Sequence, residues 1–350
     1  LADAVNDLLR QRRHCLLVVS EGFPVGDLGE RSDAFGHTEF SASQTTVERV
    51  VVNYLNEVGL AARGGARGNM PGTDQRHNMV YASTVDLEEA YGRQIRFFVE
   101  RMIQACEWVE QKHQEHLPAP FLSAVVEDCL ERGLDVTMGG AHYNLSGIQA
   151  IQVANVADSL AVLKQLVYGE QHVSRKELLA ACRENFDGHE IRQQICLHQA
   201  PKYGNDTDWV DQLGAEWLTY IADQLKGYTN RRGGAYHMGL YTVSAHVPMG
   251  QNVAATPDGR LSRSPLADGG MSPMYGRDHL GPTAVLRSVA RAPLTRASNG
   301  TLLNKKYLPV FFETPRGRKQ FSALLKAFVL LGIHHVQFNV LHREDLQAAQ

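Results

Sequence analysis

Residues 231–250 read RRGGAYHMGLYTVSAHVPMG, and they open a region that extends to residue 304. The region continues through ATPDGR (255–260), PLADGGMSP (265–273), GRD (276–278) and ASNGTLLN (297–304). This density of Gly, Pro, Asp and Asn between short apolar runs predicts strands joined by long loops, chiefly a strand over residues 239–247. Long loops of this kind commonly carry a binding site or a lid.

Composition limits the class of protein. At 350 residues the chain is long enough for two or more domains, and 43% apolar with 21% charged residues describes a soluble globular protein. The net charge of −3 gives no reason to expect nucleic acid or an anionic membrane as partner, and no apolar run approaches the ~20 residues of a membrane span. The five irregularly spaced cysteines favour a reducing cytoplasm over a disulfide framework or a zinc site. The start at Leu1, without a signal peptide, suggests a fragment.

Periodicity places the other elements. Apolar residues at three- and four-residue spacing predict one long helix over residues 87–109, ending before Leu117. Further helices are expected over residues 45–58, 122–132, 154–170, 174–185, 211–228 and 319–331. CLLVVS (15–20) is typical of a buried strand, and HVQFNV (335–340) alternates as a strand does.

Two polar clusters have a metal-binding interpretation and a simpler one. His113 and His116 could share a metal, but no third ligand is near in the sequence, which favours solvated side chains. Asp206, Asp208 and Asp211 could bind calcium, although the start of a helix explains acidic residues more simply. No metal site is therefore predicted.

The loop strings resemble a known family. RGG-x-x-x-x-GLYTVSAHVP-x-G, PLADGG-x-SP, GRD-x-x-GPTA and ASNGTLLN resemble the C-terminal half of glycyl radical enzymes, nearer the dehydratase and lyase branch than pyruvate formate-lyase itself. PFLSAVVEDCLERGLDVTMGGAHYNLSGIQ (120–149) and APKYGNDTDWVD (200–211) extend the resemblance over residues 93–350. It implies an α/β fold, the later half of a ten-stranded barrel built from two five-stranded halves.

The resemblance also implies a chemistry. Intact members cleave C–O, C–N or C–C bonds of small molecules, using a glycyl radical that a radical S-adenosylmethionine activating enzyme installs. Their radical glycine lies in R-V-x-G-Y and their catalytic cysteine in G-C-x-E, and neither string occurs here. Cys182-x-Glu184 lies in a predicted helix, where a packed cysteine is expected. We therefore predict an inactive fragment or chimera with no catalytic residue and no bound cofactor. Its cavity would be lined by loop and strand-end polar groups: Tyr241, Ser244, His246, Asn299 and Asn304.

The N-terminal part resembles a different family. VVSEG (18–22), PGTDQR (71–76) and ASTVDLEEAYG (82–92) resemble the C-terminal portion of phosphofructokinases over residues 14–92. The resemblance implies that Glu21 contacts fructose hydroxyls and that Arg76 binds the sugar 6-phosphate, a role that suits an arginine fork. The expected domains are an incomplete phosphofructokinase-like α/β segment (1–92) and an incomplete pyruvate formate-lyase-like domain (93–350). Two alternatives stay open: sugar-phosphate binding, and a non-catalytic interaction module that associates as a homo-oligomer through unpaired strand edges.

Overall fold

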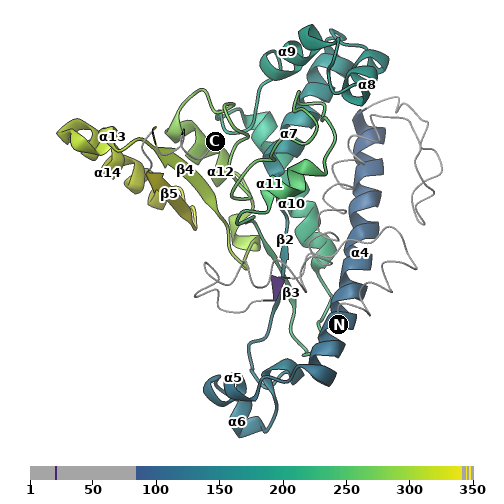
Figure 1. Cartoon of the computed structure of the whole chain (residues 1–350), viewed down its shortest axis with the longest axis vertical. Helices are drawn as coiled ribbons and strands as arrows, with labels where there is room; N and C mark the ends of the chain where they lie inside the picture. Colours follow the sequence, from purple (N-terminus) through teal and green to yellow (C-terminus); the bar gives the residue numbers. More distant parts are fainter. Residues whose placement is uncertain (1–19, 22–83, 341–343, 345–346, 348–350) are drawn as a thin grey trace. The chain divides into compact units, whose positions relative to one another are not determined.

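The computed structural model describes residues 84–340, Ser20–Glu21 and the single residues Glu344 and Gln347 (Figure 1). These residues fall into two compact units. The first contains residues 84–149 and 221–238, and the second contains residues 150–220 and 239–340. The predicted strand 15–20 and helix 45–58 lie outside the described residues, apart from Ser20.

The longest element of the first unit is helix α4 (Thr84–His116). It buries the apolar stripe that the sequence predicts, including Leu87, Ile95, Phe98 and Met102. The predicted long helix is thus confirmed, and it ends where Leu117 and Pro118 follow. Glu110, on the same helix, is also buried, and its carboxylate accepts hydrogen bonds from Ser146 Oγ (2.8 Å) and from the backbone N–H of Arg231 (2.8 Å).

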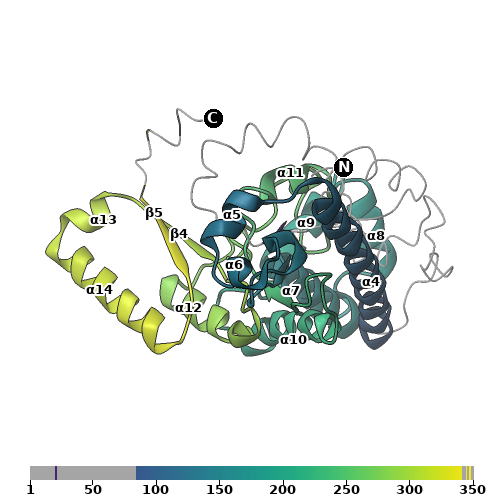
Figure 2. The same cartoon turned by 90° about the horizontal axis from the view of Figure 1, so that it is seen from below.

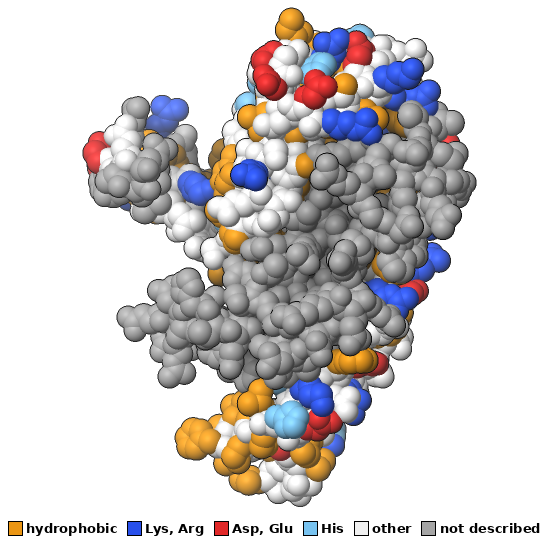
Figure 3. Space-filling model, turned by 45° about the vertical axis from the view of Figure 1, so that its right-hand side comes forward, with side chains coloured by type: hydrophobic (Ala, Val, Ile, Leu, Met, Phe, Trp, Pro, Cys, Tyr) orange, Lys and Arg blue, Asp and Glu red, His pale blue; other side chains and the backbone are white. Residues whose placement is uncertain are grey.

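Short elements follow α4 in the first unit. They are α5 (Pro120–Val125), α6 (Cys129–Arg132), the 3₁₀ turn η1 (Val136–Met138), β2 (Ser146–Gln149) and β3 (Tyr236–Gly239). Strand β1 (Ser20–Glu21) pairs antiparallel with β2, in a sheet of order β1-β2-β3. The prediction of one helix over 122–132 is wrong, because Val126 is extended and Asp128 is left-handed (φ 72°). Apolar side chains gather over α5 and α6 in Figure 3, where Phe121, Val125 and Leu130 are exposed.

The second unit begins with a helical core. Every residue of α7 (Val153–Val162) is buried, and the chain continues as the π-helix η2 (Leu163–Gly169). Helices α8 (Arg175–Arg183), α9 (Glu190–His198) and α10 (Asp208–Leu225) follow. The last five residues of α10, 221–225, belong to the first unit. Ser174 and Glu177 form a capping box at the start of α8, which explains why this helix begins there.

The loop-rich region of the second unit departs from its prediction. Strand β3 ends at Gly239, Thr242–Ala245 forms a hydrogen-bonded turn, and α11 (His246–Gln251) follows. The predicted strand over residues 239–247 is therefore wrong beyond its first residues. Val243 is left-handed (φ 51°), and Pro248 lies in the first turn of α11, where a helix needs no N–H donor. Leu240 alone continues the pairing, through a parallel bridge to Thr301.

The chain then forms a βαβ unit. After α12 (Pro282–Ala290) and η3 (Leu294–Arg296), strand β4 (Leu303–Tyr307) is followed by α13 (Val310–Glu313), α14 (Pro315–Leu330) and β5 (Val336–Val340). Strands β4 and β5 pair in parallel, and Figures 1 and 2 both place α13 and α14 beside them. The predicted terminal strand is confirmed, and α14 begins four residues earlier than predicted because Thr314 caps it.

Candidate functional site

The β4–β5 sheet has one polar and one apolar face. Its parallel register pairs Asn304 with Gln337 and Lys306 with Asn339. Paired residues in a sheet project to the same side and neighbours along a strand to opposite sides, so these four side chains share one face. We call Asn304, Lys306, Gln337 and Asn339 the polar face. Gln337 Nε2 donates to Asn339 Oδ1 across 3.1 Å, which ties two of its amides together.

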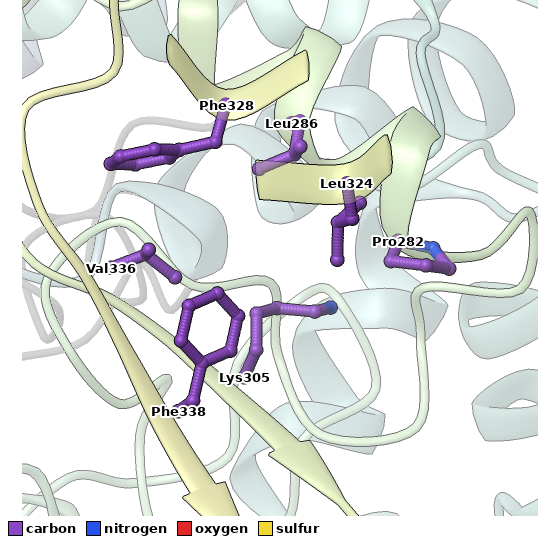
Figure 4. A pocket seen from close by; sticks show the side chains of 7 residues that line it. All are labelled: Pro282, Leu286, Lys305, Leu324, Phe328, Val336 and Phe338. Atoms are coloured by element: carbon purple, nitrogen blue, oxygen red, sulfur yellow. The ribbon is translucent and has the colours of Figure 1, made fainter. Parts of the chain in front are cut away.

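The opposite face of the sheet is covered by apolar side chains. A small pocket there lies between β4–β5 and helices α12 and α14 (Figure 4). It is lined by Pro282, Leu286, Lys305, Leu324, Phe328, Val336 and Phe338. The ring of Tyr307 packs against four phenylalanine rings on this side, among them Phe311 at 5.3 Å between centroids. The apolar face is thus the packed side of the sheet.

A loop with several polar side chains runs beside the start of β4. We call residues 267–275 the site loop; it contains Asp268, Ser272 and Tyr275. Ser272 Oγ accepts from the backbone N–H of Asn304 across 3.0 Å, and Lys306 Nζ donates to Asp268 Oδ2 across 2.8 Å. The Lys306 ammonium also lies 4.5 Å from the centre of the Tyr275 ring. The loop and the polar face therefore form one continuous set of polar groups.

His246 joins this set from the first turn of α11. Its ring centre lies 6.3 Å from that of Tyr275. Burial lowers the pKa of His246, while the nearby Asp268 carboxylate partly opposes that shift. Burial raises the pKa of Tyr275, and the Asp268 carboxylate adds to this effect. The imidazole is therefore held neutral near pH 7, beside a lysine and a carboxylate that compensate each other.

A second group of polar side chains lies where Leu240 pairs with the segment before β4. Leu240 N–H donates to Gly300 O and Leu302 N–H donates to Leu240 O, both across 2.8 Å. A Cβ added at Gly300 would lie 3.5 Å from the Tyr241 ring, so the ring passes directly over this glycine. Three side-chain atoms here are buried without a hydrogen-bond partner among the described residues: Asn299 Nδ2, Thr301 Oγ1 and Asn304 Oδ1. Buried polar atoms of native proteins are seldom left unpaired, so these three atoms are candidates for contact with a ligand or water.

The five predicted lining residues lie at the Leu240 bridge, on the polar face and around the start of α11. The structure places Tyr241 at the bridge before β4, Asn304 on the polar face, and His246 beside Tyr275. Ser244 is exposed in the turn before α11. That all five line a cavity stays a prediction. Sequence reasoning missed Asp268, Tyr275, Lys306, Gln337 and Asn339, although period-two alternation from Asn304 could have indicated Lys306.

A buried ionic network lies behind the site loop in the second unit. Asp158 of α7 and Asp258 are fully buried, and both pair with Arg277, in the case of Asp158 across 3.1 Å. Burial raises the pKa of Asp158 to about 6, whereas Arg277 and hydrogen bonds hold the pKa of Asp258 below its ordinary value despite burial. Arg260 donates to three backbone carbonyls of the same region, those of Val253, Ala254 and Ser264. The network fixes the loops on either side of residue 268.

The cysteines that the structure describes are all buried. Cys182 lies in α8 and is buried, which confirms the prediction of a packed helix cysteine. Burial raises the pKa of the Cys129 thiol, and it raises that of Cys196 to about 12. Thiols of this kind stay protonated near neutral pH, and the thiolate is the reactive form.

The candidate metal ligands have other roles. Among the described residues, no group of three or more His, Cys, Asp and Glu side chains could hold a metal ion. The aspartates that open α10 pair instead with arginines of the α12 region: Arg287 with Asp206 (2.9 Å), and Arg291 with Asp206 (2.7 Å) and Asp208. Across the part of the chain that the structure describes, no helix has the length and apolar character needed to cross a bilayer.

Of the two residues predicted to bind a sugar phosphate, the structure describes only Glu21. Glu21 lies in β1, whose backbone pairs with β2 at Ser146. Arg76 lies outside the described residues. Their joint role in binding a sugar phosphate stays a prediction.

Comparisons with known protein families cover most of the chain. Residues 45–250 match the family model described as pyruvate formate lyase-like, and residues 267–350 match the glycine radical model. The first match begins inside the segment 14–92 that resembles phosphofructokinase, and the comparisons do not support that second resemblance.

Individual relatives give the same result. The chain is 40% identical over 278 residues to the probable dehydratase YbiW of Escherichia coli K12, covering 76% of this chain and 34% of that protein. It is 32% identical over 270 residues to trans-4-hydroxy-L-proline dehydratase of Clostridioides difficile, covering 77% and 34%. The chain thus spans about a third of the length of the curated relatives that it matches.

Solved structures agree with these relatives. The glycerol-bound form of the B12-independent glycerol dehydratase from Clostridium butyricum superposes with a TM-score of 0.78 at 38% identity, over 85% of this chain and 38% of that one. Hydroxyproline dehydratase from Clostridioides difficile, with trans-4-hydroxy-L-proline bound, gives a TM-score of 0.78 at 30% identity over the same shares.

Proposed function

The chain belongs to the pyruvate formate lyase-like family, and from this premise we propose that it forms part of the substrate cavity of a glycyl radical dehydratase or lyase. The polar face, the site loop and Tyr241 would make one wall of that cavity. The observation that carries the proposal is the set of buried polar atoms on Asn299, Thr301 and Asn304 that have no partner among the described residues, beside a sheet whose other face packs against α13 and α14. Donors and acceptors without a partner at the edge of a polar surface could form hydrogen bonds with a small hydroxylated molecule.

The residues of this wall suit binding and orientation. Carboxamides offer both donors and acceptors, so Asn304, Gln337 and Asn339 can bind a hydroxyl group in either sense. The neutral imidazole of His246 could accept a proton from the substrate and so become an imidazolium, or it could donate a hydrogen bond while it stays neutral. When a glycyl radical is present, as the resemblance implies for intact relatives, it supplies hydrogen-atom abstraction. This chain's contribution would be to hold the substrate and to exclude water from it.

The radical itself gives a separate test of the proposal. The 350 residues contain neither R-V-x-G-Y nor G-C-x-E, so we expect them to hold no glycyl radical by themselves. The chain is incubated anaerobically with a radical S-adenosylmethionine activating enzyme, and its EPR spectrum is recorded. We expect no glycyl doublet from this chain. A doublet that isotopic labelling assigns to one of its glycines would refute that part of the proposal.

Ligand binding tests the wall directly. Saturation-transfer NMR with glycerol, propane-1,2-diol and trans-4-hydroxy-L-proline should show transfer from the full chain to at least one of them. Asn304→Leu removes a carboxamide from the polar face and should abolish that transfer. The matched control is Asn252→Leu, because Asn252 is an exposed asparagine at the end of α11. Equal transfer in both variants, or none in the wild type, would contradict the proposal.

A further inference from the structure

One buried amide touches both ends of the site loop. Asn155, in the first turn of α7, is fully buried. Its Oδ1 accepts from the backbone N–H of Ala267 across 2.9 Å, and its Nδ2 contacts the sulfur of Met274 at 3.4 Å. Ala267 directly precedes Asp268, and Met274 directly precedes Tyr275. Asp268 and Tyr275, the two titratable residues of the loop, therefore each follow directly after a residue that Asn155 contacts.

The same face of α7 also holds the segment after the loop. Asp158 follows Asn155 by three residues and therefore lies on the same side of the helix. Its Oδ2 pairs with Arg277, two residues beyond Tyr275, while its Oδ1 accepts from the backbone N–H of Tyr203 across 2.7 Å. Because every residue of α7 is buried, this face is a rigid platform under the loop.

The other contacts of the loop explain what depends on this platform. Met271 N–H donates to Leu302 O across 3.2 Å, and Ser272 Oγ binds Asn304, so the middle of the loop is held by the strand. The start of the loop is held by Asn155 at Ala267 and, one residue earlier, by the bond from Leu266 N–H to His246 O across 3.1 Å. Without that acceptor, the Ala267 N–H would be buried and unpaired, and the backbone would have to shift to reach water or another acceptor. A shift there would move the Asp268 carboxylate away from Lys306 and His246.

We propose that Asn155 is a positioning residue of the candidate site, which sets the place of Asp268 and Tyr275 from behind without reaching the substrate itself. The inference rests on the proposed function only in taking the site loop as part of the site. It deepens the proposed function, because it names the group that fixes the charge beside His246.

The titration of His246 in the full chain, without any ligand, is the readout. The groups that face this ring are Asp268, Lys306 and Tyr275, and the negative charge of Asp268 raises the pKa of His246. Asp268→Asn removes that charge and should lower the pKa measured from the His246 ring proton by NMR. Asn155→Ala should lower it in the same direction by a fraction of that amount. The resonance is assigned with His246→Gln.

A matched control separates positioning from a general loss of stability. Val156→Ala removes a buried side chain from the same turn of α7, so it should lower the melting temperature by several degrees. The valine side chain has no group that could hydrogen-bond to the site loop, so this substitution should leave the His246 titration unchanged. Should Asn155→Ala fail to fold, Asn155→Ser keeps a shorter hydroxyl acceptor and should give an intermediate shift.

Two results would overturn the inference. One is a His246 titration in a folded Asn155 variant that matches the wild type. The other is an equal shift in Val156→Ala, which would show that any loss of packing in α7 has the same effect. Neither result depends on substrate binding, so failure of this inference and failure of the proposed function can be told apart.

Discussion

Substituting Gly270 by alanine tests whether the site loop lies against the strands as described. Gly270 has φ +89°, a conformation that L-residues rarely adopt. A Cβ at this position would lie 2.7 Å from the backbone nitrogen of Tyr241 and closer still to the carbonyl of Leu240. Since these atoms are backbone and not the end of a flexible side chain, either the loop or the strand must move.

The control for this substitution lies in the same region. Gly276 also has a positive φ, +69°, but a Cβ there would meet nothing within 4 Å. Gly276→Ala should therefore carry the cost of the left-handed conformation alone, about 1–2 kcal/mol. Gly270→Ala should carry that cost and in addition about 1–3 kcal/mol for the forced contact. The difference in the free energy of unfolding should therefore be about 1–3 kcal/mol.

Thermal unfolding followed by circular dichroism measures this difference. At about 2–4 °C per kcal/mol for a domain of roughly 150–250 residues, Gly276→Ala should lower the melting temperature by about 2–8 °C. Gly270→Ala should lower it by a further ~2–12 °C, and near-UV dichroism should report altered surroundings of the tyrosines. Equal melting temperatures for the two variants would refute the close approach of the loop to the strand.

Two further predictions concern buried charges. Arg277→Met should lower the free energy of unfolding by about 3–5 kcal/mol, because it leaves two buried carboxylates unpaired. Arg287→Met removes an exposed ion pair and should cost at most about 1 kcal/mol. Similar urea midpoints for the two variants would contradict this prediction. Burial raises the pKa of Asp211 to about 6 from 3.8, so the stability that its proton contributes is present below about pH 4 and is lost as the pH rises through 6. The free energy of unfolding of the wild type, relative to that of Asp211→Asn, should therefore fall between about pH 4 and 6.5 and stay level above pH 7. If this difference between the two proteins does not change with pH, the pKa of the Asp211 carboxyl is not raised.

Elements with a strong local pattern could be predicted from the sequence. The stripe that includes Leu87, Ile95 and Phe98 predicts α4, and the alternation of HVQFNV predicts β5. Both patterns arise because one face of the element is buried, and this periodicity is visible in the sequence of the element alone. The loop sequences that resemble those of glycyl radical enzymes likewise predicted the class of protein. Such loops have a definite sequence of residues and not only a repeating apolar pattern, so they identify a family.

The arrangement of the loop-rich region could not be predicted in the same way. GLYTVSAHV has the composition of a strand, yet the turn at Val243 and the start of α11 at His246 depend on contacts with residues far along the chain, such as the bond from Leu266 N–H to His246 O. Lys306 meets Asp268 across 38 positions of sequence, and Asn155 meets Ala267 across 112. No local pattern records such pairs, so the sequence indicated candidate polar residues without showing which of them meet.

The most direct test of the account is to map where a ligand binds. Glycerol, propane-1,2-diol or trans-4-hydroxy-L-proline is titrated into the ¹⁵N-labelled chain while the side-chain amide resonances of its asparagines and glutamines are followed. We expect the amide resonances of Asn304, Gln337 and Asn339 to shift together, while that of Asn252, at the far end of α11 from His246, does not shift. Shifts at Asn252 without shifts on the polar face of β4–β5 would contradict the claim that this face receives the substrate.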